Sequence, residues 1–396
     1  MQNLNQKKRI IYGAAIIIIL GAAGFLAYRY LVPVIIVRPG SEEERLRGRI
    51  PGEPGAPAAG EAVPEAAGQG EEATVLTLEK ALFQITDFPV VSPETNKTGN
   101  KVMFYKKEGG GLYEYDISQK KLEKIAAITV VGLVEALWSP VRDRAAVLYA
   151  DQEVLKGFLH INASSTSALP EGLRGFSWSP DGKNAAYLGR RNRELNLSIA
   201  DSSGRNARIV FSTPILDSQI EWITNDVIVF QTAPSGLAEG YAFVYSRATG
   251  LFTKLFGPLY GFSTLWSPDG SRVFLSTTNA AGKDLRSAVY DRSGKEVMRL
   301  PFQTLPEKCR WADAENLYCA APAAIPASAI LPDDYLRGEY NSLDQLVRVN
   351  IKEKSVQALP LEEERFDASD IAISPNQAYL FFVNRFDGTL WGLKIR

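Results

Sequence analysis

The chain has 396 residues, with 44 Lys and Arg against 45 Asp and Glu, and a formal net charge of -1. This balance argues against nucleic acid as the main partner, because binding to phosphate requires a basic surface. One histidine, His160, excludes multi-histidine metal sites, and its alternating strand context indicates a structural role. Two cysteines exclude a four-cysteine zinc site and a cysteine-ligated iron–sulfur cluster. We therefore expect no metal and no cofactor.

An uncharged apolar run covers residues 10–28, and a second apolar stretch follows at 31–37. Roughly 20 apolar residues are enough to cross a bilayer core. Basic residues at 7–9 precede the run, so the positive-inside rule predicts a cytoplasmic N-terminus at 1–9 and a transmembrane anchor at 10–37. A cleaved signal peptide is the alternative interpretation. Both interpretations place the rest of the chain outside the cytoplasm.

Residues 38–74 are rich in Pro, Gly, Ala and Glu and contain almost no aromatic side chains. A segment of this composition cannot bury enough apolar surface to offset the entropy lost on ordering. We expect a disordered linker that acts as a flexible tether.

An internal repeat follows the linker. Its clearest copies are Trp-Ser-Pro at Trp138, Trp178 and Trp266, each followed by a short apolar strand. More degenerate copies begin at Trp222, Trp311, Ser92-Pro93 and Ser374-Pro375. Most copies are spaced about 40 to 47 residues apart, with room for four short strands each, which is the signature of propeller blades. We predict an all-β chain forming a seven-bladed β-propeller, rather than one of six or eight blades.

The repeated motif has a local physical basis. A strand ends in an aromatic residue that packs between neighbouring sheets, and Ser-Pro-Asp-Gly then forms a tight turn. Proline presets its φ angle, aspartate bonds to nearby backbone, and glycine accepts a positive φ.

This Trp-Ser-Pro-Asp-Gly pattern resembles the repeat of TolB-like propellers, which are related to the WD-repeat class. The resemblance covers residues 75–396 and implies a propeller that binds protein or peptide at one face or in its central channel. It is specific for the fold and poorly specific for function.

The chain ends also carry a prediction. The last repeat stops after its third strand, 390–395, while the segment 75–85 precedes the first repeat without a blade of its own. We expect this segment to supply the missing outer strand, because such a closure removes an exposed sheet edge.

Cys309 and Cys319 lie on either side of a predicted turn, at equal distances from its centre. Residues placed in this way are cross-strand neighbours, at a separation that a disulfide can span. Export favours the oxidised pair, and two reduced core cysteines are the alternative.

The long insertion 321–343 interrupts the repeat spacing near the C-terminus. Long ordered loops are often functional, and aromatic residues and arginine suit a protein-binding surface. The candidate partner-binding residues are Ile330, Leu331, Asp333, Asp334, Tyr335, Arg337 and Tyr340. The alternative is a lid that only packs across one face of the propeller.

No Gly-x-Ser-x-Gly elbow, Walker A motif or dinucleotide fingerprint occurs in the sequence, and no catalytic constellation stands out. The leading hypothesis is a non-enzymatic protein or peptide interaction module in the cell envelope, held by a single-pass anchor in the cell membrane with its propeller extracytoplasmic. The alternatives are an exported propeller enzyme of the lyase or lactonase type, or a sensor of carbohydrate or peptidoglycan fragments that uses the central channel.

Overall fold

The computed structural model describes residues 81–396, apart from 153, 163, 192, 216 and 362–364. The predicted anchor at 10–37 and linker at 38–74 lie outside these residues. Within the described part of the chain, no helix has the length and apolar character needed to cross a membrane.

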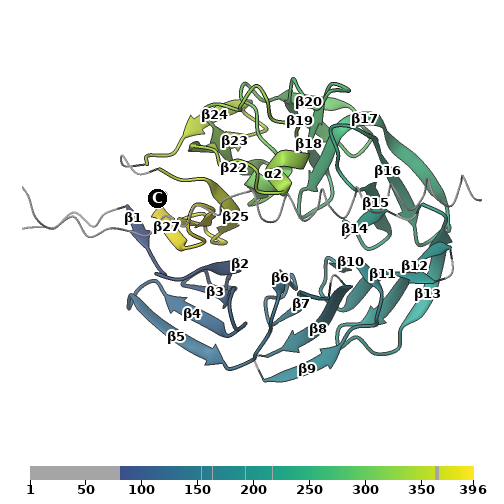
Figure 1. Cartoon of the computed structure of the whole chain (residues 1–396), viewed down its shortest axis with the longest axis horizontal. Helices are drawn as coiled ribbons and strands as arrows, with labels where there is room; N and C mark the ends of the chain where they lie inside the picture. Colours follow the sequence, from purple (N-terminus) through teal and green to yellow (C-terminus); the bar gives the residue numbers. More distant parts are fainter. Residues whose placement is uncertain (1–80, 153, 163, 192, 216, 362–364) are drawn as a thin grey trace, which may run out of the picture. The chain divides into compact units, whose positions relative to one another are not determined.

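Antiparallel sheets succeed one another around a ring (Figure 1). Five sheets have four strands each, and a sixth has seven. The first sheet contains β2 (Val90–Thr95), β3 (Lys101–Lys106), β4 (Leu112–Asp116) and β5 (Lys121–Ala126). The second contains β6 (Leu133–Trp138), β7 (Arg144–Asp151), β8 (Val154–Ile161) and β9 (Ser165–Ala168). The third contains β10 (Leu173–Trp178), β11 (Asn184–Arg191), β12 (Glu194–Asp201) and β13 (Arg208–Thr213).

The seven-stranded sheet contains β14 (Ser218–Trp222), β15 (Val227–Thr232), β16 (Glu239–Ser246), β17 (Phe252–Trp266), β18 (Arg272–Thr278), β19 (Arg286–Asp291) and β20 (Glu296–Arg299). The next sheet follows the 3-10 helix η1 (Pro306–Lys308) and contains β21 (Cys309–Trp311), β22 (Asn316–Pro322), β23 (Asp344–Asn350) and β24 (Ser355–Ala358), with the short helix α2 (Asp333–Leu336) between β22 and β23. The last sheet contains β25 (Ala368–Ile373), β26 (Tyr379–Asn384), β27 (Leu390–Lys394) and β1 (Leu82–Gln84).

Strand β17 explains the sheet of seven strands. The sequence predicts a fourth strand at 252–255 and a separate innermost strand that ends at Trp266, whereas the structure runs them together as one strand of 15 residues. The first part of β17 pairs with β16, and its last part pairs with β18. The seven-stranded sheet therefore consists of two four-stranded units that share β17.

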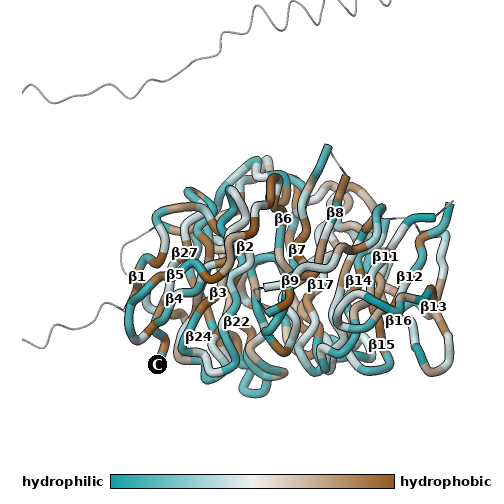
Figure 2. The backbone as a smooth tube through the Cα atoms, turned by 90° about the horizontal axis from the view of Figure 1, so that it is seen from below, coloured by the Kyte–Doolittle hydropathy of each residue, from teal (hydrophilic) through white to brown (hydrophobic). Residues whose placement is uncertain are grey.

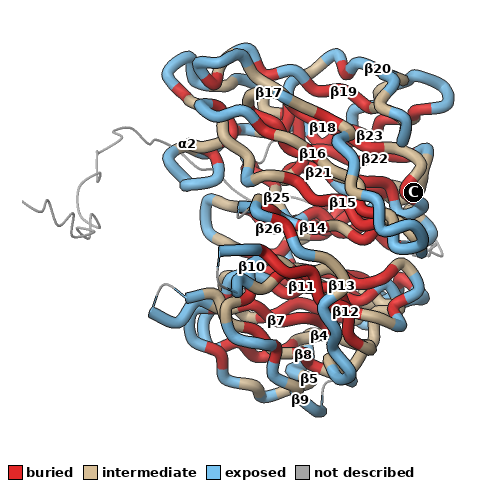
Figure 3. The backbone as a smooth tube through the Cα atoms, turned by 90° about the vertical axis from the view of Figure 1, so that its right-hand side faces the viewer, coloured by how far each residue is buried: buried red, intermediate tan, exposed pale blue. Residues whose placement is uncertain are grey.

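The apolar core lies between neighbouring sheets, and second strands such as β3, β18 and β26 contribute a run of four or five buried residues to it (Figure 3). Phe104, Phe274 and Phe381 on these strands are fully buried. In three units, the tryptophan that ends the innermost strand ties its sheet to the one before it: Trp138, Trp178 and Trp311. Trp178 Nε1, for example, donates to the carbonyl oxygen of Leu137 at 2.8 Å.

The tight turns form as their residue types predict. Ser179 Oγ donates to Asp181 Oδ1 at 2.7 Å and accepts the backbone N–H of Asn184 at 2.9 Å, while Gly182 has a φ of 68°. The side chains of Ser267 and Asp269 make the same hydrogen bond in the copy after Trp266. These bonds satisfy the backbone where the chain reverses.

The prediction for the first repeat is wrong in its register. Ser92-Pro93 lies inside the innermost strand β2, and the turn falls at 96–100 instead. The pairing of Thr95 with Val102 makes Thr95 the counterpart of Trp138, which pairs with Ala145. A β-bulge between Val91 and Glu94 accommodates Ser92 and Pro93 within the strand.

The chain ends pair as the sequence predicts. β1 forms the outer strand of the last sheet by pairing antiparallel with β27, so that Phe83 faces Gly392. The closure is confirmed over Leu82–Gln84, and 75–80 lie outside the described residues. Side by side in Figure 1, β1 and β27 join the two ends of the ring.

We expect Gly392→Ala to destabilise this closure by about 1–3 kcal/mol, because overpacking forces neighbouring atoms apart. A Cβ at Gly392 would lie 2.5 Å from Phe83 Cζ in β1 and 3.2 Å from Phe381. Urea denaturation measures the loss of unfolding free energy. Gly189→Ala in β11 is the matched control, because its Cβ would meet nothing within 4 Å. Equal losses for both variants would contradict the packing argument.

Candidate functional site

The ring has two faces that differ in the connections they carry. The turn face carries the turns that follow the innermost strands, such as 179–182, together with the hairpins between third and fourth strands. The loop face carries the connections between second and third strands and those between successive units, including the insertion 321–343. Hydrogen bonds such as Arg247 N to Asp226 O show that the two kinds of turn share one face.

A cavity of about 710 Å³ occupies the middle of the ring, enclosed by the innermost strands. Proline turns of the turn face, such as Pro140 and Pro180, line one end of it. Four carboxylates and two guanidinium groups provide its charges: Glu94, Glu135, Glu221, Asp370, Arg142 and Arg310. A cavity with convergent charged groups is the default candidate for a binding site.

Three of these charged residues occupy one structural position. Glu94, Glu221 and Arg310 each immediately precede the residue that ends an innermost strand. Neutral or small residues, such as Ser177, hold this position in other units. The residue at this position therefore differs from unit to unit and determines the charge of the channel. The fold itself requires only that the position be part of a strand.

Glu94 forms the centre of an ion-pair cluster at the channel wall. Arg310 Nη2 lies 2.6 Å from one carboxylate oxygen, and Arg142 Nη2 lies 3.4 Å from the other. Arg142 also donates to Thr95 Oγ1 at 2.9 Å. Arg142 comes from the turn between β6 and β7 and Arg310 from β21, so the cluster joins the first sheet to the second sheet and, across the channel, to the sheet of β21 to β24. Glu94 is thus held by two cations.

Glu221 has a different environment. Enclosure by the protein raises its pKa from 4.5 to about 8, although the N–H of Trp266 and the charge of Arg310 oppose the shift. Desolvation disfavours the charged form of a carboxyl group. Glu221 therefore carries its proton over much of the neutral range.

Glu135 and Asp370 lie near the loop-face end of the channel, where the innermost strands begin. Both come from β-bulges, between Leu133 and Glu135 in β6 and between Ser369 and Ala372 in β25. Bulges re-aim side chains, and they are common at binding sites. Both residues are exposed to the solvent of the channel.

Ser92 stands between these two acids. Its backbone N–H donates weakly to Asp370 Oδ2 at 3.5 Å, and its Oγ accepts the N–H of Ala136 at 2.8 Å. Ser92 and Asp370 both adopt positive φ angles, of 52° and 47°. Backbone strain of this kind persists only where surrounding structure holds it.

The pKa values of both acids are raised. Desolvation is the main cause for Glu135, and the nearby carboxylate of Asp370 raises its pKa further. Desolvation also raises the pKa of Asp370, although Arg385, Lys107 and Arg310 exert opposing charges. A cation between the two carboxylates would relieve both effects.

The insertion 321–343 packs against the loop face, so most of the predicted partner-binding residues point inward. Asp333 accepts from Ser235 Oγ at 2.9 Å and from Gly236 N at 2.6 Å. Leu331 and Tyr335 are 2% and 3% exposed and pack in a small core with Leu285 and Leu305. Ile330 and Tyr340 are half-buried, Asp334 accepts from the N–H of Ile330, and only Arg337 is exposed. The packing agrees with the alternative of a lid.

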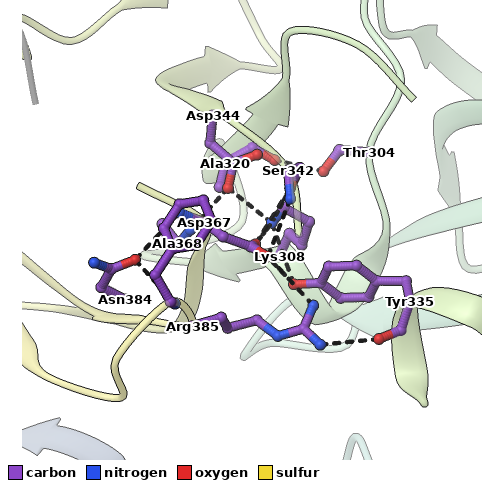
Figure 4. A network of polar contacts seen from close by, with 11 residues as sticks. Thr304, Lys308, Ala320, Tyr335, Ser342, Asp344, Asp367, Ala368, Asn384 and Arg385 are labelled. Atoms are coloured by element: carbon purple, nitrogen blue, oxygen red, sulfur yellow. Dashed lines mark hydrogen bonds and ion pairs between the residues drawn. The ribbon is translucent and has the colours of Figure 1, made fainter. Parts of the chain in front are cut away.

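A buried lysine anchors this lid (Figure 4). Lys308 Nζ lies 2.7 Å from Asp344 Oδ2 and 2.6 Å from Asp367 Oδ1, and all three side chains are at most 1% exposed. The ammonium also bonds to Ser342 Oγ at 3.0 Å and to the hydroxyl of Tyr335 at 3.2 Å. These contacts link η1, the insertion and the last two sheets.

Arg385 covers the other side of the lid. Its guanidinium lies 3.9 Å from the ring centre of Tyr335, and its Nη2 donates to the Tyr335 carbonyl oxygen at 2.9 Å. Burial raises the pKa of Tyr335 well above its usual value, and the carboxylate of Asp367 raises it further. Tyr335 is therefore a neutral packing residue between two cations.

The remaining candidates have structural positions. Cys309 and Cys319 pair directly across β21 and β22 and form a disulfide, with Cα atoms 4.1 Å apart. Oxidation of this pair in the cell stays a prediction. His160 is buried, and its Nδ1 lies 2.8 Å from the hydroxyl of Tyr105. In the described residues, no group of three or more His, Cys, Asp or Glu side chains could hold a metal ion.

Solved structures share this architecture. Oligogalacturonate lyase from Vibrio parahaemolyticus matches with a TM-score of 0.57 and 12% identity, over 80% of this chain and 93% of that one. The β-propeller domain of the Trilobed protease from Pyrococcus furiosus matches with a TM-score of 0.54 and 14% identity, over 77% and 95%. An uncharacterised protein of Listeria monocytogenes matches with a TM-score of 0.52 and 12% identity, over 78% and 96%. The chain thus has a β-propeller fold, and these low identities extend the likeness no further.

Comparisons of the amino-acid sequence assign the chain to no known family. No protein-family model matches the chain. No curated protein matches it either. The fold and the channel chemistry therefore carry the functional argument.

Proposed function

We propose that the protein is a seven-bladed propeller, tethered to the cell membrane by residues 10–37, that binds a protein or peptide in the cell envelope through its loop face and channel. The count of seven takes the two units that share β17 as separate blades. The cytoplasmic N-terminus and the extracytoplasmic propeller follow from the charges around the apolar segment. A disulfide between Cys309 and Cys319 suits an oxidising compartment outside the cytoplasm.

The charged channel is the observation that carries this proposal. Its cavity is large enough to admit side chains of a partner, and Glu135 and Asp370 meet solvent near its loop-face end. The ion pairs of Glu94 and the N–H bond to Glu221 give those two acids structural roles. Glu135 and Asp370 remain as the carboxylates that a partner would contact.

An exported enzyme is the second candidate. Two neighbouring carboxyl groups with raised pKa values, Glu135 and Asp370, suit general acid–base chemistry. The solved structure of oligogalacturonate lyase has the same fold, although 12% identity supports no common reaction. Turnover of an oligosaccharide that is lost in Glu135→Gln and Asp370→Asn would favour this candidate.

Site-specific photocrosslinking in native membranes tests the interaction module. A photoreactive residue at Leu336 or Val154, both exposed on the loop face, is expected to capture the same extracytoplasmic protein, identified by mass spectrometry. Leu251 is the matched control, because it is 61% exposed in a hairpin of the turn face. Equal capture from Leu251, or no adduct from either loop-face position, would contradict the proposal.

A further inference from the structure

The insertion 321–343 covers only part of the loop face. Its contacts reach Gly236 between β15 and β16, Gly282 between β18 and β19, and Arg385 between β26 and β27. It therefore lies over the units from β14 onward and the last sheet. In the described part of the chain, no hydrogen bond or ion pair joins the insertion to the second sheet, β6 to β9, and we take the loop face of that sheet to be open.

This open part contains an apolar groove of about 550 Å³. The groove lies between the connection that follows β5 and the loop-face ends of β7, β8 and β9. Apolar and aromatic side chains provide most of its lining: Ile128, Val130, Val131, Tyr149, Phe158 and Ala168. The rings of Tyr149 and Phe158 lie 6.2 Å apart and form its inner wall.

Three valines around the groove are unusually exposed for apolar residues. Val131 is 81% exposed, Val134 is 49% exposed and Val154 is 48% exposed. Val131 and Val134 flank the start of β6, and Val154 lies at the start of β8; the end of β7 connects them, because Gly132 O accepts the N–H of Ala150 and Asp151 pairs with Val154. Exposed apolar residues that gather in one patch, in contrast to scattered ones, mark interaction sites.

The groove lies close to the open carboxylates of the channel. Val131 and Glu135 are four residues apart in sequence, so their Cα atoms are at most about 14 Å apart. Asp370 is near enough to raise the pKa of Glu135. One short extended segment can therefore contact the groove and the channel mouth together.

We infer that the partner presents a segment in which a basic side chain lies a few residues from apolar ones. The basic group enters between Glu135 and Asp370, and the apolar side chains occupy the groove beside Val131. This inference rests on the proposed function and adds the chemistry of the partner.

Charge complementarity selects this occupant. The channel has four carboxylates against two guanidinium groups, and both guanidinium groups pair with Glu94. Asp151 at the groove is paired with Lys156 at 2.7 Å, so it offers little attraction to a partner. Among the described residues, no basic side chain lies within ion-pair distance of Glu135 or Asp370. An acidic segment would meet repulsion at this mouth, and a purely apolar one would leave the two carboxylates facing each other.

Peptide binding to the full-length chain in detergent tests the inference. The probe is a fluorescent, blocked hexapeptide with one arginine and three leucines, compared with the same peptide carrying citrulline in place of arginine and with one carrying serines in place of the leucines. Fluorescence anisotropy gives the dissociation constants. We expect both altered peptides to bind at least tenfold more weakly.

Variants of the chain locate the binding. The double substitution Glu135→Gln with Asp370→Asn is expected to abolish the preference for the arginine peptide over the citrulline peptide. Val131→Ser is expected to weaken the binding of both peptides by about the same factor. Glu123→Gln, on the outer strand β5, is the control and should change neither. Binding of the arginine peptide that survives the double substitution unchanged, or no binding of it at all, would overturn the inference. Crosslinking of an envelope protein from Val154 would in that case still support the interaction module, with a partner of different chemistry.

Discussion

Lys308→Met is expected to lower the free energy of unfolding by about 3–5 kcal/mol, because removing one partner leaves buried charges uncompensated. The substitution keeps most of the apolar stem but leaves the fully buried Asp344 without a cation, and leaves the fully buried Asp367 with only Arg385 at 3.6 Å. It also removes the hydrogen bonds to Ser342 and Tyr335 that fix the lid. Chemical denaturation of the purified chain measures the loss.

Two comparisons separate the ion pairs from general effects on the lid. Arg337→Met is the matched control, because its ion pairs with Asp334 and Glu339 are largely exposed, and it should cost less than about 1 kcal/mol. Adding Asp344→Asn and Asp367→Asn to Lys308→Met should restore part of the stability, since no fully buried carboxylate then lacks its cation; Arg385, which loses Asp367, is partly exposed to solvent. A loss for Lys308→Met no larger than that for Arg337→Met would show that the buried network contributes little.

Glu221→Gln is expected to change how stability depends on pH. The folded chain holds the Glu221 proton up to a pKa of about 8, whereas the unfolded chain releases it near 4.5. The folded state therefore binds more protons in this range, so wild-type stability falls as pH rises from about 4.5 to 8. Glutamine has no proton to lose and removes this fall. At about 1.4 kcal/mol per pKa unit, the variant should gain about 2–4 kcal/mol over wild type between pH 5 and pH 9.

Denaturation midpoints at several pH values check this expectation. Glu123→Gln is the control, because Glu123 is exposed and Lys121 lowers its pKa, so the substitution should produce no gain at high pH. Parallel pH profiles for wild type and Glu221→Gln would mean that Glu221 ionises normally in the folded chain.

The insertion 321–343 shows how one sequence feature allowed two outcomes. Its aromatic and charged residues suit a binding surface, but Tyr335 and Leu331 are buried and Asp333 caps a neighbouring loop. The sequence could not distinguish a binding surface from a packed lid, because the residues that the insertion contacts lie far from it in the chain. The sequence could have indicated two of the channel charges. Glu221 and Arg310 each directly precede the tryptophan that ends an innermost strand. No such signal marked Glu94, because Thr95 stands where five of the other six units have tryptophan.

Local patterns in the sequence determined the strands, most of the tight turns, the cross-strand partners Cys309 and Cys319, and the closure of Leu82–Gln84 onto the last sheet. Each depends on residues that are close in the chain or on a repeat length, so neighbouring residues suffice to define it. Tertiary structure alone decided which charges meet in the channel, how Lys308 joins three parts of the chain, and which part of the loop face stays open. The physical reason is that a ring brings residues from every unit to one centre, and electrostatic pairing there depends on distances across the ring that no local pattern encodes.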